Sequence, residues 1–258
     1  MKKSVLLTLI VLLCSLSFAA GQQAASPQAA SQAPSAQPAS PQPTSPQNDQ
    51  PAKESKATDR LQAAADVLDE IQGTPDKGIP QQILSSAECV AVVPSMLKGG
   101  FIFGAKYGRG IASCRTPKGW SAPAFFAVEG GSFGFQIGGQ AVDLVMLIMN
   151  EKGMRNLLSS KFELGADASV AAGPVGRLAE GDTDWKMRAE VLTYSRARGV
   201  FAGVTLNGAA IKQDKDSTRE FYGHMVTFPA SLKGEVDPPD TANPFLRTLA
   251  KWAQEAAK

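Results

Sequence analysis

Three groups of residues in this 258-residue chain have types and spacings that could do chemistry, and the first would supply a nucleophile. Gly130–Gly134 reads G-G-S-F-G and matches the G-x-S-x-G elbow, in which a strand precedes the serine and a helix follows it. The base would have to be His224, the one histidine, with Asp167, Asp182 or Asp214 orienting it. The residues after Ser132 alternate as a strand does, so we expect no catalytic residue and a partly buried, structural His224.

The second group is acidic, and its chemistry would be metal binding. Glu180, Asp182 and Asp184 have the alternate spacing of a calcium loop, but the glycine and the distal glutamate of that loop are missing. One histidine and three cysteines are too few for a zinc site of the usual kind. Neither of the common glycine-rich phosphate motifs is present. We therefore expect no metal ion, no cofactor and no enzymatic activity.

The third group is basic and aromatic, and it suits an anionic membrane surface. No acidic residue lies between Glu88 and Glu129, and a second acid-free stretch runs from Val191 to Gln213. A cation near such a surface contributes about 1 kcal/mol, and aromatic rings settle at the headgroup level. The alternative is that the cations lie on different faces and the aromatic residues belong to the core. The residues expected to bind lipid are Lys98, Phe101, Lys106, Tyr107, Arg109, Arg115, Lys118, Arg196 and Arg198.

The overall composition narrows the class of partner. Lys and Arg number 26 against 24 Asp and Glu, a formal net charge of +2. Dedicated nucleic-acid binders normally carry a strong basic excess, so we expect no nucleic-acid partner. With 43% hydrophobic and 19% charged residues, the chain as a whole is typical of a globular protein.

The N-terminal region has the composition of an exported protein. Residues 1–21 are predicted to be a signal peptide, because Lys2 and Lys3 precede an apolar run that ends in small residues. Residues 22–57 contain no Leu, Ile, Val, Met or aromatic residue and are predicted to be a disordered Gln/Pro/Ala/Ser-rich spacer. We therefore expect a periplasmic or secreted protein that lies peripherally on a membrane surface.

Export also bears on the cysteines. Cys89 and Cys114 follow the predicted signal peptide, and an oxidising compartment favours a disulfide between them. Such a bond would close a loop of about 25 residues and stabilise the fold by roughly 3.5 kcal/mol in the chain-entropy model. Two buried free thiols are the alternative.

The elements that must position these residues are helices at both ends and strands between them. Thr58 is predicted to cap a helix through Gln72, and Pro80 to begin a short one through Ser86. Asn150 should cap a helix through Ser159, and Pro244 should start a terminal amphipathic helix. Short apolar runs separated by Gly and Pro predict strands at 90–93, 101–104, 110–114, 124–128, 133–138 and 141–149.

This order predicts an α+β fold. We expect a Gly-rich, mostly antiparallel curved sheet or barrel-like sandwich with an N-terminal helix and short packing helices. The folded domain should span residues 58–234, and residues 235–258 should form a Pro-rich linker and the C-terminal amphipathic helix.

Several ordered motifs in this region resemble the SYLF domain family, found in bacteria and eukaryotes. The resemblance runs from Thr58 to Gly223. Its motifs are K-G-G-F at 98–101, Y-G-R-G at 107–110, W-S-A-P-A-F at 120–125, G-F-Q-I-G at 134–138 with Asp143, L-G-A-D at 164–167, G-P-V-G-R at 173–177, Y-S at 194–195 and G-V-F-A-G at 199–203.

The resemblance implies a non-enzymatic, lipid-binding module. Eukaryotic members are associated with phosphoinositide membranes, partly through an N-terminal amphipathic helix, and yeast members also bind and bundle actin. Here that helix carries Arg60 as its one cation between Thr58 and Gln72, against acids that include Asp66 and Glu70, so we expect it to insert poorly.

Together these observations predict an exported, non-catalytic domain that binds anionic, phosphoinositide-like headgroups through a basic and aromatic surface. The alternative is an envelope protein-interaction or assembly module that does not bind lipid. We expect actin not to be a partner, because export would separate the two proteins.

Overall fold

The computed structural model describes residues 56–74, 78–100, 103–133, 138–159, 161–175, 189–197, 200–203 and 206–255. All of them belong to one structural unit, Gln50–Lys258. The predicted signal peptide, nearly all of the predicted spacer, Phe101, Arg198 and the three residues of the calcium-loop pattern lie outside the described ranges. None of the helices in those ranges has the length and apolar character needed to span a bilayer.

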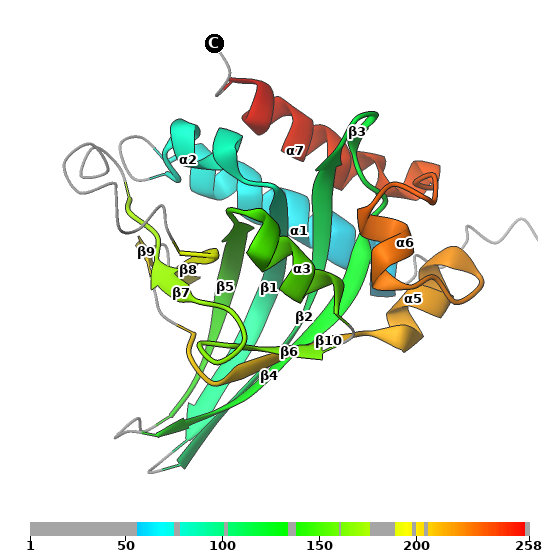
Figure 1. Ribbon diagram of the computed structural model, residues 1–258. Coiled ribbons are helices and arrows are strands. Elements are labelled where there is room, and N and C mark those ends of the chain that lie inside the picture. The colour runs from blue at the N-terminus through cyan, green and yellow to red at the C-terminus, as the bar shows by residue number, and fades with distance from the viewer. Residues whose placement is uncertain are drawn as a thin grey trace, which may run out of the picture. The chain divides into compact units, whose positions relative to one another are not determined.

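Ten strands within the described residues form one sheet, in the order β6-β10-β4-β2-β1-β5-β8-β7, with β3 on β2 and β9 on β8. Every pair is antiparallel except β7 and β8. The sheet curls into a half-barrel, so that β6 and β10 cross in front of the long strands (Figure 1). The strands are β1 (Cys89–Gly100), β2 (Phe103–Thr116), β3 (Gly119–Trp120), β4 (Ala124–Phe133), β5 (Gly138–Ile148), β6 (Lys161–Leu164), β7 (Val170–Ala172), β8 (Val191–Ala197), β9 (Val200–Gly203) and β10 (Ala209–Gln213).

Helices cover both faces of this sheet. They are α1 (Lys56–Gln72), α2 (Gln81–Ser86), α3 (Glu151–Leu158), α5 (Lys215–Tyr222), α6 (Phe228–Leu232), the 3-10 turn η2 (Asp240–Ala242) and α7 (Asn243–Glu255). We call the face against α1, α2 and α7 the helix face, and the face toward α3, α6, β6 and β10 the concave face. The predicted α+β class, with a mostly antiparallel curved sheet, is confirmed.

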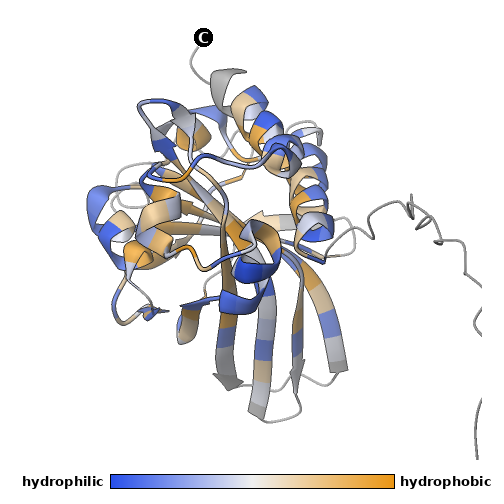
Figure 2. Ribbon diagram, turned by 90° about the vertical axis from the view of Figure 1, so that its right-hand side faces the viewer, coloured by the Kyte–Doolittle hydropathy of each residue, from blue (hydrophilic) through white to orange (hydrophobic). Residues whose placement is uncertain are grey.

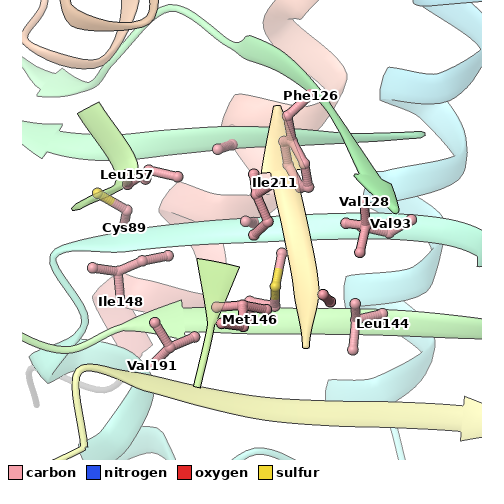
Figure 3. Packing of buried hydrophobic residues seen from close by; sticks show 14 of the residues in the cluster. Cys89, Val93, Phe126, Val128, Leu144, Met146, Ile148, Leu157, Val191 and Ile211 are labelled. Atoms are coloured by element: carbon pink, nitrogen blue, oxygen red, sulfur yellow. The ribbon is translucent and has the colours of Figure 1, made fainter. Parts of the chain in front are cut away.

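Strand alternation divides the core between these faces. In β1, Val90 and Val92 pack on the helix face, whereas Ala91 and Val93 pack on the concave face. Figure 3 shows the concave cluster, with Leu157 of α3 and Ile211 of β10 closing over side chains of the central strands. Because both faces are covered here, these strands read as nearly continuous apolar runs.

The predicted helices are present with small shifts at their ends. Asn150 caps α3, its side chain accepting a hydrogen bond from the Gly153 amide at 2.9 Å. The first helix begins at Lys56, two residues before the predicted cap at Thr58. The terminal helix packs on α1, where Trp252 Nε1 donates to Asp69 Oδ1 at 2.8 Å.

The strands are longer than predicted, because glycines expected to separate them lie inside them. β2 runs without a break through Gly108 and Gly110. A Cβ at Gly108 would lie 2.5 Å from Val93 Cγ1, and one at Gly110 would lie 2.5 Å from Phe126 Cζ. These glycines therefore make room for bulky neighbours on the concave face.

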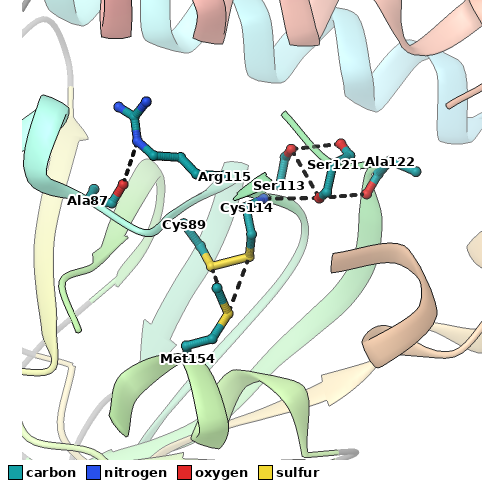
Figure 4. The surroundings of a disulfide bond; sticks show 8 residues. All are labelled: Ala87, Cys89, Ser113, Cys114, Arg115, Ser121, Ala122 and Met154. Atoms are coloured by element: carbon teal, nitrogen blue, oxygen red, sulfur yellow. Dashed lines mark hydrogen bonds between the residues drawn. A yellow bond between two sulfur atoms is a disulfide. The ribbon is translucent and has the colours of Figure 1, made fainter. Parts of the chain in front are cut away.

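The predicted disulfide is confirmed. Cys89 of β1 lies directly opposite Cys114 of β2, and their sulfurs are bonded. The Met154 sulfur of α3 packs against the bond, 3.2 Å from Cys89 Sγ and 3.7 Å from Cys114 Sγ (Figure 4). The bond joins β1 and β2 at the end of the pair that the helices cover.

Candidate functional site

The strands β5, β1, β2 and β4 continue past the helices at one end of the sheet (Figures 1 and 2). On β1, Val92 is fully buried, whereas Leu97 is 60% exposed; on β2, Ile111 is fully buried, whereas Tyr107 is 42% exposed. We call this uncovered part the bare end. It comprises residues 97–100, 103–107, 129–133 and 138–141.

Two lysines meet on the concave face of the bare end. Lys98 of β1 lies directly opposite Lys106 of β2, so their side chains share a face, and Gln140 of β5 is on the other side of Lys98. The Lys106 chain passes over Gly130, where a Cβ would lie 3.0 Å from Lys106 Cε. Lys106 Nζ donates a hydrogen bond to the Asn207 carbonyl at 3.2 Å.

The environment of this pair disfavours its two positive charges. Burial lowers the pKa of Lys98, and burial followed by the charge of Lys98 lowers the pKa of Lys106. Within the described ranges, neither lysine forms an ion pair with an acidic side chain. Like charges directly opposite each other destabilise a sheet, so an anion bound here would relieve an existing cost.

The helix face of the bare end is different. Leu97 and Tyr107 lie directly opposite each other, with Ala141 beside Leu97 and Glu129 beside Tyr107. Arg109 Nε donates to Tyr107 Oη at 3.0 Å. This side of the sheet therefore presents an aliphatic side chain, an aromatic ring and a guanidinium in one row.

A buried carboxylate fixes that guanidinium. Asp214 Oδ2 lies 3.5 Å from Arg109 Nε and 3.7 Å from Arg60 Nη1. The same carboxylate caps α5, accepting hydrogen bonds from the Ser217 amide at 3.1 Å and the Ser217 hydroxyl at 2.7 Å. The hydrogen bond to Tyr107, and then the charge of Asp214, raise the pKa of Arg109.

Arg115 and Lys118 lie at the other end of β2, and Arg196 lies at the border of the bare end, in an ion-pair network. Arg115 Nε donates to the Ala87 carbonyl at 2.9 Å (Figure 4), and its guanidinium lies 4.8 Å from the Trp120 ring centroid. Lys118 lies in the turn between β2 and β3. Arg196 forms ion pairs with Asp143, at 2.7 Å, and with Glu70 of α1. The structure thus brings Lys98 and Lys106 together and places Tyr107 and Arg109 on the opposite face. It separates Arg115, Lys118 and Arg196 from the lysine pair, whereas Phe101 and Arg198 lie outside the described residues.

Asp143 has a positioning role that sequence reasoning missed. Its Oδ1 accepts a hydrogen bond from the Ser95 amide at 2.9 Å, and its Oδ2 accepts from Arg196. Ser95 has φ of +51°, and the register of β1 shifts between Val92 and Leu97. Asp143 therefore holds the irregular turn of β1 at which the bare end begins. The available signal was an acidic residue inside an otherwise apolar run.

The described residues of the nucleophile pattern, Gly130 to Phe133, belong to a strand, and Gly134 lies outside the described ranges. Ser132 lies within strand β4, opposite Gly104, rather than in a strand-to-helix turn. His224 follows α5 and is exposed, so the expectation of a partly buried histidine is wrong. Among the described residues, no group of three or more His, Cys, Asp or Glu side chains could hold a metal ion.

The chain is similar to one protein family and to several curated proteins. The family model described as "Ysc84: Las17-binding protein actin regulator" matches residues 129–252. SH3 domain-containing YSC84-like protein 1 of Xenopus laevis is 36% identical over 184 residues, 70% of this chain and 55% of that protein. The human protein of that name is 33% identical over 183 residues, 70% of this chain and 53% of its own length. Protein YSC84 of Saccharomyces cerevisiae is 35% identical over 182 residues, 69% of this chain and 39% of its own length.

These findings correct one expectation. The chain spans about half the length, or less, of the curated relatives it matches. The matching family model is described as an actin regulator, and another yeast relative is named LAS seventeen-binding protein 3. The expectation that actin is not a partner, which depended on export alone, is therefore wrong. The relatives' names describe binding and regulatory proteins.

Proposed function

We propose that this chain, a member of the SYLF (Ysc84) family, is a binding module whose bare end recognises anionic membrane lipids. Its relatives are named for the proteins they bind and for the domains they contain. In this proposal the sheet acts as a rigid support, and the chemistry is the electrostatic capture of a lipid headgroup rather than catalysis.

One observation carries the proposal: Lys98 and Lys106 oppose each other without an acidic partner in the described part of the chain. A lysine with a structural role would normally be offset by a carboxylate. Lys152 is an example, because its Nζ lies 2.6 Å from Glu190 Oε1. A phosphate-bearing headgroup would supply the missing negative charge, and charge-assisted hydrogen bonds to it are about twice as strong as neutral ones.

The test is co-sedimentation of the full chain with vesicles, with and without an anionic lipid, at low and high salt. We expect binding to anionic vesicles that weakens as salt rises. The double variant Lys98→Gln/Lys106→Gln should lose most of this binding. Its matched control is Lys215→Gln/Lys233→Gln, which removes the same charge from two exposed lysines elsewhere and should bind as the unaltered chain does. Equal, salt-insensitive binding to both vesicle types, or retention of binding by the first variant, would contradict the proposal.

A second candidate function is protein binding in actin regulation. It is favoured by the description of the family model that matches residues 129–252. Co-sedimentation of the full chain with filamentous actin tests it directly. We expect the chain in the pellet only when filaments are present, and its absence from that pellet would remove this candidate. An envelope partner is the corresponding candidate if the protein is exported.

We also propose that the protein acts in an oxidising compartment. The Cys89–Cys114 disulfide and the predicted signal peptide at residues 1–21 support this location. Mass spectrometry of the protein recovered from its native cells should find an N-terminus close to residue 22 and no free thiol at Cys89. An intact Met1 with reduced cysteines would refute export.

A further inference from the structure

The helix face of the bare end carries two exposed apolar side chains. Leu97 is 60% exposed and Tyr107 is 42% exposed, and they lie directly opposite each other on β1 and β2. Apart from Glu129 beside Tyr107, their neighbours on this face are small: Ala141, Gly99, Ala105 and Gly139. Because small neighbours do not cover them, Leu97 and Tyr107 project from the sheet, and a partner can contact both side chains.

Arg109 adds a positive charge at the edge of this surface. Its guanidinium shares the buried Asp214 carboxylate with Arg60, so two cations are offset by one carboxylate. Asp216 and Glu220 act on these two arginines only through their charge at longer range, and among the described residues Asp214 is the one acid that forms an ion pair with Arg109. The Arg109 side chain is 44% exposed and therefore accessible to a second acidic group.

The orientation of these groups is already set in the isolated chain. The hydrogen bond from Arg109 to Tyr107 and the ion pair with Asp214 hold the guanidinium and the ring in place. Binding would therefore immobilise few side chains, which lowers its entropic cost. Tyr and Arg are also the residue types that most often dominate binding energy at protein interfaces.

We propose that Leu97, Tyr107 and Arg109 form a docking surface for a protein segment that carries a large apolar side chain next to a carboxylate. The apolar side chain would pack on Leu97 and Tyr107, and the carboxylate would bind Arg109. This surface is separate from the lysine pair of the proposed lipid site, which lies on the opposite face of the same strands.

Charge favours a protein segment over a membrane on this face. Helix α1 borders the surface, since its Arg60 shares Asp214 with Arg109 and its Glu70 pairs with Arg196. This helix carries two basic residues and four acidic ones, Asp59, Asp66, Asp69 and Glu70. In the ion pairs that border this face, Arg60, Arg109, Arg196 and Lys212 are balanced by Asp214, Asp143, Glu70 and Glu129. An extended anionic lipid surface would therefore meet no net positive charge, whereas a peptide can place one carboxylate on Arg109.

The test is selection of a random-sequence peptide library displayed on phage against the full chain. We expect enriched peptides to share a large apolar residue beside Asp or Glu. A synthetic peptide of the enriched sequence should bind Leu97→Asp at least about tenfold more weakly than the unaltered chain. Met225→Asp is the matched control, because Met225 is 37% exposed elsewhere on the chain and should not affect binding.

A double-mutant cycle tests the contact between the peptide's acidic residue and Arg109. The same peptide with its acidic residue changed to the amide should bind the unaltered chain and Arg109→Gln equally weakly, since the two changes remove one interaction. The variant Lys98→Gln/Lys106→Gln should bind the peptide normally even if it no longer binds vesicles. A failure of the lipid proposal would therefore leave the docking proposal standing, and the reverse also holds.

Enriched peptides without this pattern, or peptides that bind Leu97→Asp normally, would overturn the proposal. So would a Leu97→Asp variant that loses anionic vesicles as completely as the lysine double variant does while retaining the peptide. That result would assign the helix face to the membrane site.

Discussion

The four strands β5, β1, β2 and β4 have two halves that differ in how far their side chains are buried. In the covered half, side chains such as Val90 and Ala91 are buried on both faces of the sheet. In the bare end, the same strands carry Lys98 on one face and Leu97 on the other, both accessible to solvent. An irregular turn at Ser95 separates the two halves of β1, but both halves pair with the same neighbouring strands, so the difference arises from what packs on each face. The covered half holds the fold together, and the bare end is available for binding.

This contrast predicts that stability and binding respond to different residues. A substitution in the covered half should lower the free energy of unfolding, whereas one in the bare end should change binding at little cost to the fold. Measuring the free energy of unfolding and vesicle binding for variants in each half therefore tests this division.

The largest expected effect is in the concave core. Phe126 of β4 is fully buried among the side chains shown in Figure 3. Phe126→Ala should lower the free energy of unfolding by about 4 kcal/mol, because burial is lost and a cavity remains. Tyr107→Ala, an aromatic truncation in the bare end, should cost less than about 1 kcal/mol. Denaturant unfolding of both variants is the measurement, and equal losses would contradict the division.

The disulfide gives the next largest effect. Cys89→Ala/Cys114→Ala removes a bond that closes a loop with a sequence separation of 25. The free energy of unfolding should fall by about 3 kcal/mol, mainly because the unfolded chain gains freedom. Vesicle binding under native conditions should be unchanged, since the bond lies at the covered end. A matching loss of vesicle binding would show that the two halves are coupled.

Asp143→Asn is a third test, at the boundary between the halves. The neutral amide keeps an acceptor for the Ser95 amide but loses the ion pair with Arg196. We expect a loss of about 2 kcal/mol in unfolding free energy, typical of a charged hydrogen bond. Vesicle binding should weaken as well, although Asp143 touches no ligand, because it holds the turn at which the bare end begins. Binding retained at the unaltered level would assign Asp143 to the core alone.

The helices and the strands differ in how far the sequence predicts them. Caps and helical periodicity act locally, so Asn150 and the first helix could be predicted closely. The length of β2 could not, because Gly108 and Gly110 resemble strand breaks until their neighbours Val93 and Phe126 are known. These neighbours are distant in sequence, so their packing leaves no local signal.

Which of the basic residues share a face could not be predicted, for the same reason. Once β2 is known to be continuous, alternation places Lys106 and Arg109 on opposite faces. Grouping the cations by their spacing along the chain could not separate them. The irregular turn at Ser95 accompanies a hydrogen bond to a carboxylate from β5, which is distant in sequence, so it could not be predicted either.

The smallest expected effect is a gain, not a loss, in the free energy of unfolding, and it tests the lysine pair of the bare end directly. Lys98→Gln removes one of two like charges directly opposite each other, so the free energy of unfolding should rise by about 0.5 kcal/mol at neutral pH. The folded-state pKa of Lys98 is lowered, so the unfolded chain binds protons more tightly. The cost of the charge is therefore fully present below the folded pKa and disappears as pH rises toward the unfolded value.

The advantage of Lys98→Gln should accordingly shrink as pH rises toward the ordinary lysine pKa of about 10.4. Unfolding curves at several pH values measure this, and Lys118→Gln, at an exposed turn position, should show no such trend. The same variant should bind anionic vesicles more weakly than the unaltered chain. A gain in stability together with a loss of binding is characteristic of a residue retained for function. A loss of stability in Lys98→Gln would make the lysine pair part of the fold and remove the basis for a lipid site there.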